Sequence, residues 1–180
     1  MMNRIFLLLV ALGATCLSAP LASAQITTVP SIDVTQYLGT WYQAAHNPLA
    51  FEGGECACSQ QKLAATATPG MITVFNSCND KTPTGPVRSI SGTATSDDPV
   101  SNSKFTVDFG LPKKGEYWII GVDATYRYAV VTDSRGASLY ILSKTTTLDP
   151  VLYVEAVALA AKQVDVTKLV LTNQVGCSYP

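Results

Sequence analysis

Short β-prone runs recur at regular spacing along the second half of the chain. They cover residues 87–95, 104–109, 117–123, 128–132 and 138–144. Segments rich in Gly, Pro, Asp, Ser or Lys separate one run from the next. Such runs are typical of β-strands, and the segments between them supply turns. The even spacing predicts an all-β barrel or sandwich.

A further pair of strands is predicted before these runs, on either side of a tight turn. Thr68, Pro69 and Gly70 suit a type II turn, because Pro fixes the first φ angle and Gly accepts the positive φ that follows. The apolar, β-prone residues 71–75 come next. Together these segments predict a β-hairpin.

The pattern changes once, after Leu148. Asp149 is suited to cap a helix, and Pro150 fits the first helical position. The alanine-rich residues 151–162 then predict one helix packed on the outside of the sheet. A last strand is predicted at residues 166–172.

The first 24 residues have the pattern of a secretory signal peptide. Arg4 precedes an apolar run over residues 5–17, and Ala22-Ser23-Ala24 forms a small-x-small cleavage site. The apolar run is shorter than the roughly 20 residues that a membrane span needs. We therefore expect residues 1–24 to be removed and residues 25–180 to form a single exported domain.

The position of Cys16 leaves one question about this export open. A cysteine after a run of small residues marks lipid attachment in bacterial lipoproteins, although here Thr15 precedes it. We expect a periplasmic or secreted protein, with an outer-membrane lipoprotein as the alternative. A peripheral contact with a membrane also stays open, and we expect a monomer.

Charge and composition exclude several functions. The chain has 12 basic and 13 acidic residues and a net charge of −1, so it offers no basic surface for nucleic acid. It contains a single histidine, His46, which any histidine-based triad would have to use. It also lacks a Gly-rich phosphate loop and His/Glu metal spacing. We therefore expect no enzymatic activity, no cofactor and no metal.

Four cysteines follow the expected signal peptide: Cys56, Cys58, Cys78 and Cys177. In an oxidising compartment an even number predicts two disulfides, for which three pairings exist. A four-thiolate zinc site is the alternative. However, Cys-x-Cys with scattered partners lacks the paired Cys-x-x-Cys motifs of such sites.

Three segments resemble the signatures of the lipocalin family. Gly39 and Trp41 form a Gly-x-Trp motif near the mature N-terminus, residues 121–131 resemble the second signature, and residues 139–145 resemble the third. They occur in the family's order, and the resemblance covers residues 31–178. It implies an eight-stranded antiparallel up-and-down barrel with one C-terminal α-helix packed on the outside.

Within the family, the chain resembles the branch of apolipoprotein D and the bacterial lipocalins. Residues 41–45, 47–48, 51–52 and 117–120 carry this resemblance. One position departs from the family pattern, because Lys144 stands where the third signature normally has an arginine over the Trp. A lysine retains the cation-π contact but loses the planar stack. The resemblance places Gly39, Trp41 and Lys144 at the base of the barrel.

The resemblance also implies which side chains line the cavity. If residues 133–137 form a loop, Thr132 pairs with Ser138, Val130 with Tyr140 and Tyr128 with Leu142. In the family the position of Tyr140 points inward, so these strands and the one before them give an inward-facing set. The set is Tyr117, Ile119, Gly121, Tyr128, Val130, Thr132, Tyr140 and Leu142.

His46 and Phe51, in the predicted loop of residues 45–55, are candidates for a gate at the open end, with an unspecific loop role as the alternative. For the aromatic wall residues the alternative is that they pack a filled barrel. A one-residue shift in register would exchange inward and outward residues.

By the same resemblance, the C-terminal tail is tied to the second strand. Cys177 then pairs with Cys56 or Cys58, and Cys78 with the other. The implied function is transport or storage of a small hydrophobic ligand, such as a fatty acid or phospholipid. The alternatives are a loop-mediated protein-binding module, such as a protease inhibitor, and an enzyme that acts on a bound lipid through a thiolate of Cys58 or Cys78.

Overall fold

The computed structural model describes residues 25–48 and 56–180. The expected signal peptide, Cys16 and Phe51 lie outside the described residues. Within the described part, no helix is both long and apolar enough to cross a membrane.

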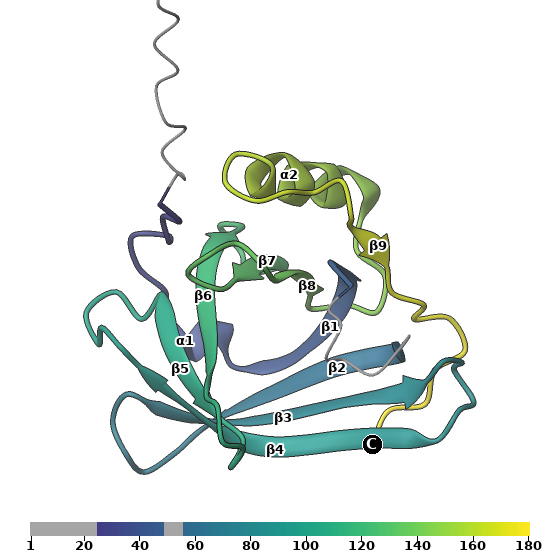
Figure 1. Cartoon of the computed structure of the whole chain (residues 1–180), viewed down its shortest axis with the longest axis horizontal. Helices are drawn as coiled ribbons and strands as arrows, with labels where there is room; N and C mark the ends of the chain where they lie inside the picture. The colour runs from purple at the N-terminus through teal and green to yellow at the C-terminus, as the bar shows by residue number, and fades with distance from the viewer. Residues whose placement is uncertain (1–24, 49–55) are drawn as a thin grey trace, which may run out of the picture.

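Eight strands form an antiparallel sheet that closes on itself (Figure 1). Strands β2 to β8 pair in chain order, and β1 pairs with both β8 and β2. The strands are β1 (Gly39–His46), β2 (Cys56–Ala65), β3 (Met71–Asp80), β4 (Val87–Ser96), β5 (Lys104–Asp108), β6 (Gly115–Val122), β7 (Tyr128–Thr132) and β8 (Leu139–Ser143). The prediction of an eight-stranded barrel is confirmed.

The predicted turn between β2 and β3 is present. Thr68 accepts a hydrogen bond from the Met71 N–H at 3.2 Å, and Gly70 has a φ of +74°. This positive φ is the reason that a glycine is needed there.

A short helix, α1 (Val34–Tyr37), lies just before β1. The Asp33 side chain caps it by accepting hydrogen bonds from the N–H groups of Thr35 and Gln36. Tyr37, at the end of α1, is 2% exposed and packs against Trp41 with ring centres 5.0 Å apart. The helix and Trp41 together close one end of the barrel, which we call the base.

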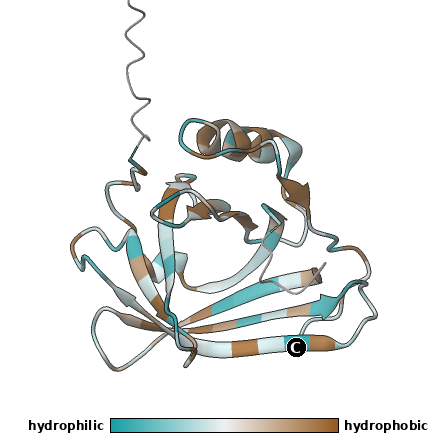
Figure 2. Ribbon diagram, viewed as in Figure 1, coloured by the Kyte–Doolittle hydropathy of each residue, from teal (hydrophilic) through white to brown (hydrophobic). Residues whose placement is uncertain are grey.

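The longer helix, α2 (Pro150–Ala160), lies on the outside of the barrel against β6, β7 and β8, as predicted. The Asp149 side chain caps it and Pro150 is its first residue. Leu152, Ala156 and Ala160 form its buried face. Figure 2 shows hydrophobic residues along α2 and on the strands it covers.

The prediction of a last strand at residues 166–172 is wrong in extent. Only β9 (Val170–Leu171) forms, paired with Ala45 and His46 of β1. The chain turns before it, where the Leu169 N–H donates to Val166 O at 3.2 Å. The apolar side chains of residues 166–172 therefore do not form a long strand.

The residues that follow β9 fill the seam where β1 and β2 part. The Thr172 N–H donates to Ala44 O at 3.0 Å, and the Cys58 N–H donates to Asn173 O at 2.8 Å. The Gln174 side chain adds hydrogen bonds to the backbone carbonyls of both strands. The tail thus joins the two strands where they no longer pair directly.

Both disulfides join β2 to another part of the chain. Cys56 is bonded to Cys78 on β3, and Cys58 to Cys177 in the tail, with Cα atoms 5.6 and 5.4 Å apart. This is one of the two pairings that the resemblance implied. The zinc interpretation is wrong, because all four sulfurs are used in these bonds.

Candidate functional site

The base of the barrel brings Gly39, Trp41 and Lys144 together. Trp41 is 0% exposed, and its indole N–H donates to Tyr37 O at 2.7 Å. Lys144 Nζ lies 4.1 Å from the centre of the Trp41 ring and donates to Leu38 O at 2.6 Å. Gly39 has a φ of +97° and adjoins the ammonium group. Burial lowers the pKa of Lys144.

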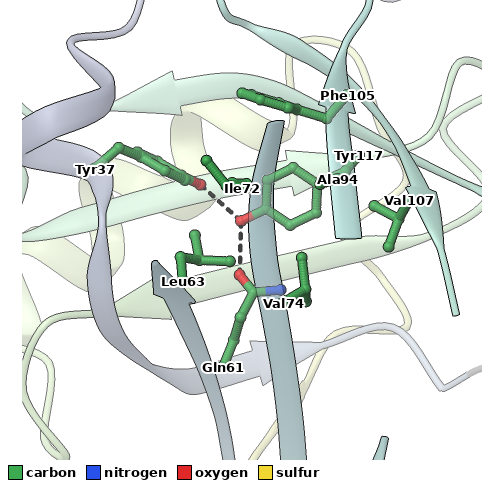
Figure 3. Close-up of a pocket in the computed structure, with 9 residues that line it drawn as sticks. All are labelled: Tyr37, Gln61, Leu63, Ile72, Val74, Ala94, Phe105, Val107 and Tyr117. Atoms are coloured by element: carbon green, nitrogen blue, oxygen red, sulfur yellow. Dashed lines mark hydrogen bonds between the residues drawn. The ribbon is translucent and has the colours of Figure 1, made fainter. Parts of the chain in front are cut away.

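Nine side chains from α1 and strands β2 to β6 line a cavity inside the barrel (Figure 3). Six of them are apolar, and the other three are two tyrosines and a glutamine. The nine are Tyr37, Gln61, Leu63, Ile72, Val74, Ala94, Phe105, Val107 and Tyr117.

The cavity between these nine residues has a volume of about 10 Å³. This is enough space for about one water molecule. The rings of Tyr37, Phe105 and Tyr117 occupy much of the interior and pack edge to face, with centres 6.5 Å apart in each neighbouring pair. Transport of a lipid requires an interior that side chains do not fill, and this part of the barrel is nearly full.

The three polar side chains of the cavity are hydrogen-bonded in a row. The Tyr117 hydroxyl donates to Gln61 Oε1 at 3.0 Å, and the hydroxyls of Tyr37 and Tyr117 lie 2.7 Å apart. A phenol has one proton, so Tyr37 donates to Tyr117 in this arrangement. We call these three residues the polar row.

The polar row is uncharged at physiological pH. Burial raises the pKa of Tyr37 well above its usual value, and the neighbouring Tyr117 adds to the effect. Burial likewise raises the pKa of Tyr117, although part of its surface faces the cavity. Both groups stay protonated because a phenolate in this apolar interior is poorly solvated.

Four of the predicted cavity residues point into the barrel. Tyr117 lines the cavity, Ile119 and Leu142 belong to the same interior cluster, and Tyr140 packs against that cluster. The structure thus places these side chains on the inner wall, whereas their contact with a ligand stays a prediction.

The predicted register between β7 and β8 is wrong by one residue. Tyr140 pairs with Val131, not Val130, and Leu142 pairs with Ala129, not Tyr128. Because side chains alternate along a strand, Tyr128 and Val130 point outward and join the cluster beneath α2. Thr132 pairs with Leu139 instead of Ser138.

The length of the turn explains this shift. Asp133 accepts hydrogen bonds from the N–H groups of Arg135 at 2.8 Å and Ser138 at 2.7 Å. These bonds hold Ser138 in the turn, so the loop is one residue longer than predicted. The strand β8 consequently begins at Leu139.

A β-bulge moves Gly121 to the outer face as well. The register of β6 against β7 shifts between Ile119 and Gly121. A Cβ atom on Gly121 would lie 2.6 Å from Cδ2 of Leu159 on α2. This glycine therefore makes room for the helix and does not line the cavity.

The sequence prediction missed the contribution of β2 to β5. Leu63 pairs with Val74 across the predicted hairpin, and Ile72 and Val74 share its inner face. The strict alternation of residues 104–109 was a sufficient signal for Phe105 and Val107. Gln61 and Tyr37 carried no comparable signal.

The two predicted gate residues have different outcomes. His46 is the last residue of β1, with Nδ1 2.8 Å from Gln43 Nε2 and 3.3 Å from Thr172 Oγ1. It thus lies at the seam filled by the tail and not in a loop. Phe51 lies outside the described residues.

A second hollow lies outside the barrel, near the base. It has a volume of about 460 Å³ and is open to solvent. Arg127, Lys144 and residues 147–150 contribute to its walls. None of the predicted ligand-binding residues lines it.

Comparisons with known proteins agree with this architecture. Residues 32–174 match the family model described as a lipocalin-like domain. The chain is 31% identical to apolipoprotein D of Oryctolagus cuniculus, over 82% of this chain and 79% of the relative. It is 30% identical to the outer membrane lipoprotein Blc of Escherichia coli K12, over 88% of this chain and 89% of the relative.

Solved structures share the fold at lower identity. Insecticyanin from the tobacco hornworm Manduca sexta superimposes with a TM-score of 0.68 at 18% identity, covering 86% of this chain and 88% of that one. The cockroach allergen Per a 4 gives a TM-score of 0.63 at 22% identity, covering 84% and 94%. With its closed barrel, the plugged base and the matching family model, this chain belongs to the lipocalin family.

Proposed function

We propose that the protein binds and carries a small hydrophobic molecule inside the barrel. The observation that carries this proposal is the cavity wall, in which six apolar side chains surround a single polar row. Such a wall, apolar with a few polar groups that converge on one point, is typical of sites for small molecules. Lipocalins are generally binders of small hydrophobic ligands and typically have no enzymatic activity.

The volume of the cavity sets a condition on this function. Sites for small molecules usually enclose about 300 to 1,000 Å³, and the space between the nine residues is about 10 Å³. Binding therefore requires side chains of the wall to move, and the aromatic rings are the largest of them. We expect ligand uptake to be accompanied by displacement of Phe105 from its position against Tyr117.

Uptake of a hydrophobic fluorescent probe tests the proposal. Ala94 lines the cavity and is 3% exposed, so the ring of Ala94→Phe takes the space that movement of the wall would open to a ligand, and is expected to abolish probe binding. Val154→Phe is the matched control, because Val154 lies on the outside of α2 and is 65% exposed. Near-ultraviolet circular dichroism checks that both variants fold.

Native mass spectrometry of protein purified without detergent provides a second readout. A carrier is expected to retain a bound small molecule or to take up the probe. If the wild-type protein does neither, the ligand-binding proposal is wrong and the protein-binding alternative takes its place. If Ala94→Phe binds the probe as well as Val154→Phe does, the site is not in the barrel interior.

We also propose that the protein is exported. Two disulfides persist in oxidising compartments and are rare in the cytosol. One of the relatives is an outer membrane lipoprotein by name. The enzymatic alternative through a thiolate loses its candidates, because Cys58 and Cys78 are both in disulfides.

A further inference from the structure

We infer that the cavity selects hydrophobic molecules whose buried end is an uncharged hydroxyl or carbonyl group, and that it discriminates against a carboxylate. This inference rests on the proposed function and narrows it to a class of ligand. The residues that make the selection are those of the polar row, Tyr37, Gln61 and Tyr117.

The first argument is that the described residues that line the cavity bring no positive charge to it. None of the nine lining residues has a charged side chain. Lys144 is directed to the base, where its ammonium group donates to the carbonyls of Leu38 and Tyr37. Arg88, farther along β4, forms an ion pair with Asp80 at 3.2 Å. A carboxylate that entered the cavity would thus be buried without a cation, which is unfavourable.

The second argument is the hydrogen-bonding capacity that remains in the polar row. The protons of both tyrosines are used within the row, which leaves the Tyr37 oxygen able to accept. Among the described residues, none accepts a hydrogen bond from the Gln61 amide nitrogen, so its N–H groups are available to a ligand. The row therefore offers the amide donors together with acceptor oxygens, of which the Tyr37 oxygen is the one that accepts no hydrogen bond within the row.

A hydroxyl group matches both of these capacities. It accepts from the Gln61 N–H and donates to the Tyr37 oxygen, and a carbonyl group uses the Gln61 donor alone. A carboxylate has no proton for Tyr37. Burial also keeps both tyrosines neutral, so the row stays uncharged across the physiological pH range.

The inference is tested with three probes of equal chain length: dodecane, dodecan-1-ol and dodecanoate, titrated at pH 8. Wild-type protein is expected to bind dodecan-1-ol about tenfold or more tightly than dodecanoate, since the anion pays the desolvation cost. Gln61→Leu is expected to weaken binding of the alcohol by about tenfold and to leave binding of dodecane unchanged, because only the alcohol forms a hydrogen bond with the amide.

Gln60→Leu is the matched control. Gln60 directly precedes Gln61 on β2, so its side chain is on the opposite face of the strand and points away from the cavity. There its amide donates to the Ser77 hydroxyl at 3.1 Å. It is expected to leave the preference for the alcohol intact. Tyr37→Phe is a second test of the polar row, because it removes the oxygen that accepts from the alcohol, and its expected loss is the same as that of Gln61→Leu.

The outcomes separate this inference from the proposed function. If dodecanoate binds as tightly as the alcohol, the inference is wrong while ligand binding stands. A preference that survives in both Gln61→Leu and Tyr37→Phe also overturns it, because the polar row is then not its cause. If none of the three probes binds to the wild-type protein, the proposed function itself fails.

Discussion

Lys144 holds the base of the barrel through one ammonium group. It lies over the Trp41 ring and donates to carbonyls of the segment that joins α1 to β1. An arginine, usual in the family at this position, has a planar group that stacks on the ring. The lysine uses a compact charge instead, which contacts the ring and the carbonyls at once.

Replacement of Lys144 by Met is expected to destabilise the protein by about 2 kcal/mol, because the carbonyls of Leu38 and Tyr37 lose their donor in a partly buried place. Lys144→Arg is expected to stay close to the wild type. Urea denaturation measures the difference. Lys162→Met, at an exposed site, is the control, and an equal loss there would contradict the role of Lys144.

The buried tyrosines predict a loss of stability in alkali. A tyrosine in the unfolded chain ionises near its usual pKa of 10.0, whereas burial raises the pKa of Tyr37 and Tyr117 in the folded protein. Their contribution to stability is therefore complete below pH 10 and is lost as the pH rises above it, by up to about 1.4 kcal/mol per pH unit for each group.

Tyr117→Phe removes one of these two groups. The free energy of unfolding of this variant is thus expected to fall less steeply above pH 10 than that of the wild-type protein. Urea denaturation from pH 8 to 11 measures both. Lys144 acts in the opposite direction, since burial lowers its pKa, but it is present in both proteins. Parallel pH curves would show that Tyr117 ionises normally in the folded state.

Among the elements, local patterns predicted the strands and the helix, and tertiary contacts decided the register. The β7 strand has its predicted bounds, and Asp149 and Pro150 begin α2 as expected. The pairing of β7 with β8 depends on how many residues the Asp133 side chain holds in the turn. Both faces of β7 and β8 are mainly apolar, so their sequences are compatible with either register. The sequence pattern alone therefore does not show which side chains point into the barrel.

The close approach of α2 to β6 depends on Gly121. A methyl group there meets the end of the Leu159 side chain, which must shift to make room, so Gly121→Ala is expected to cost about 1 kcal/mol. The double variant with Leu159→Ala is expected to recover part of this loss. Thermal unfolding monitored by circular dichroism measures both effects.

Gly115→Ala is the control for this pair. Gly115 lies on the same strand, and a Cβ atom there makes only an ordinary contact with Val107 at 3.8 Å. It is expected to leave stability almost unchanged. If the losses from Gly121→Ala and Leu159→Ala are simply additive, the two residues are not coupled.

For the whole molecule, the free volume of the barrel is the property that the sequence predicted least well. The sequence predicts an unfilled interior. In the structure, however, Tyr37 enters from the base and packs against Tyr117 of the wall, beside Phe105. These residues are far apart in the sequence. Their meeting depends on the curvature and closure of the entire sheet, and no local pattern reports it.

The two disulfides are expected to stabilise the molecule unequally. Cys58–Cys177 closes a sequence separation of 119 residues and Cys56–Cys78 one of 22. On the chain-entropy model, their removal costs about 5 and about 3 kcal/mol, respectively. Paired Cys→Ser variants, Cys58 with Cys177 and Cys56 with Cys78, allow the comparison by urea denaturation. Equal losses would mean that loop length does not set their contribution.

The tail between β1 and β2 has a consequence for biosynthesis. Residues 172–174 bridge these strands, and the bond from Cys177 secures them. Residues 172–177 lie far along the chain from the strands that they join, so this part of the barrel wall is completed by a segment made after all eight strands. A chain that lacks these residues is expected to have an open gap between β1 and β2.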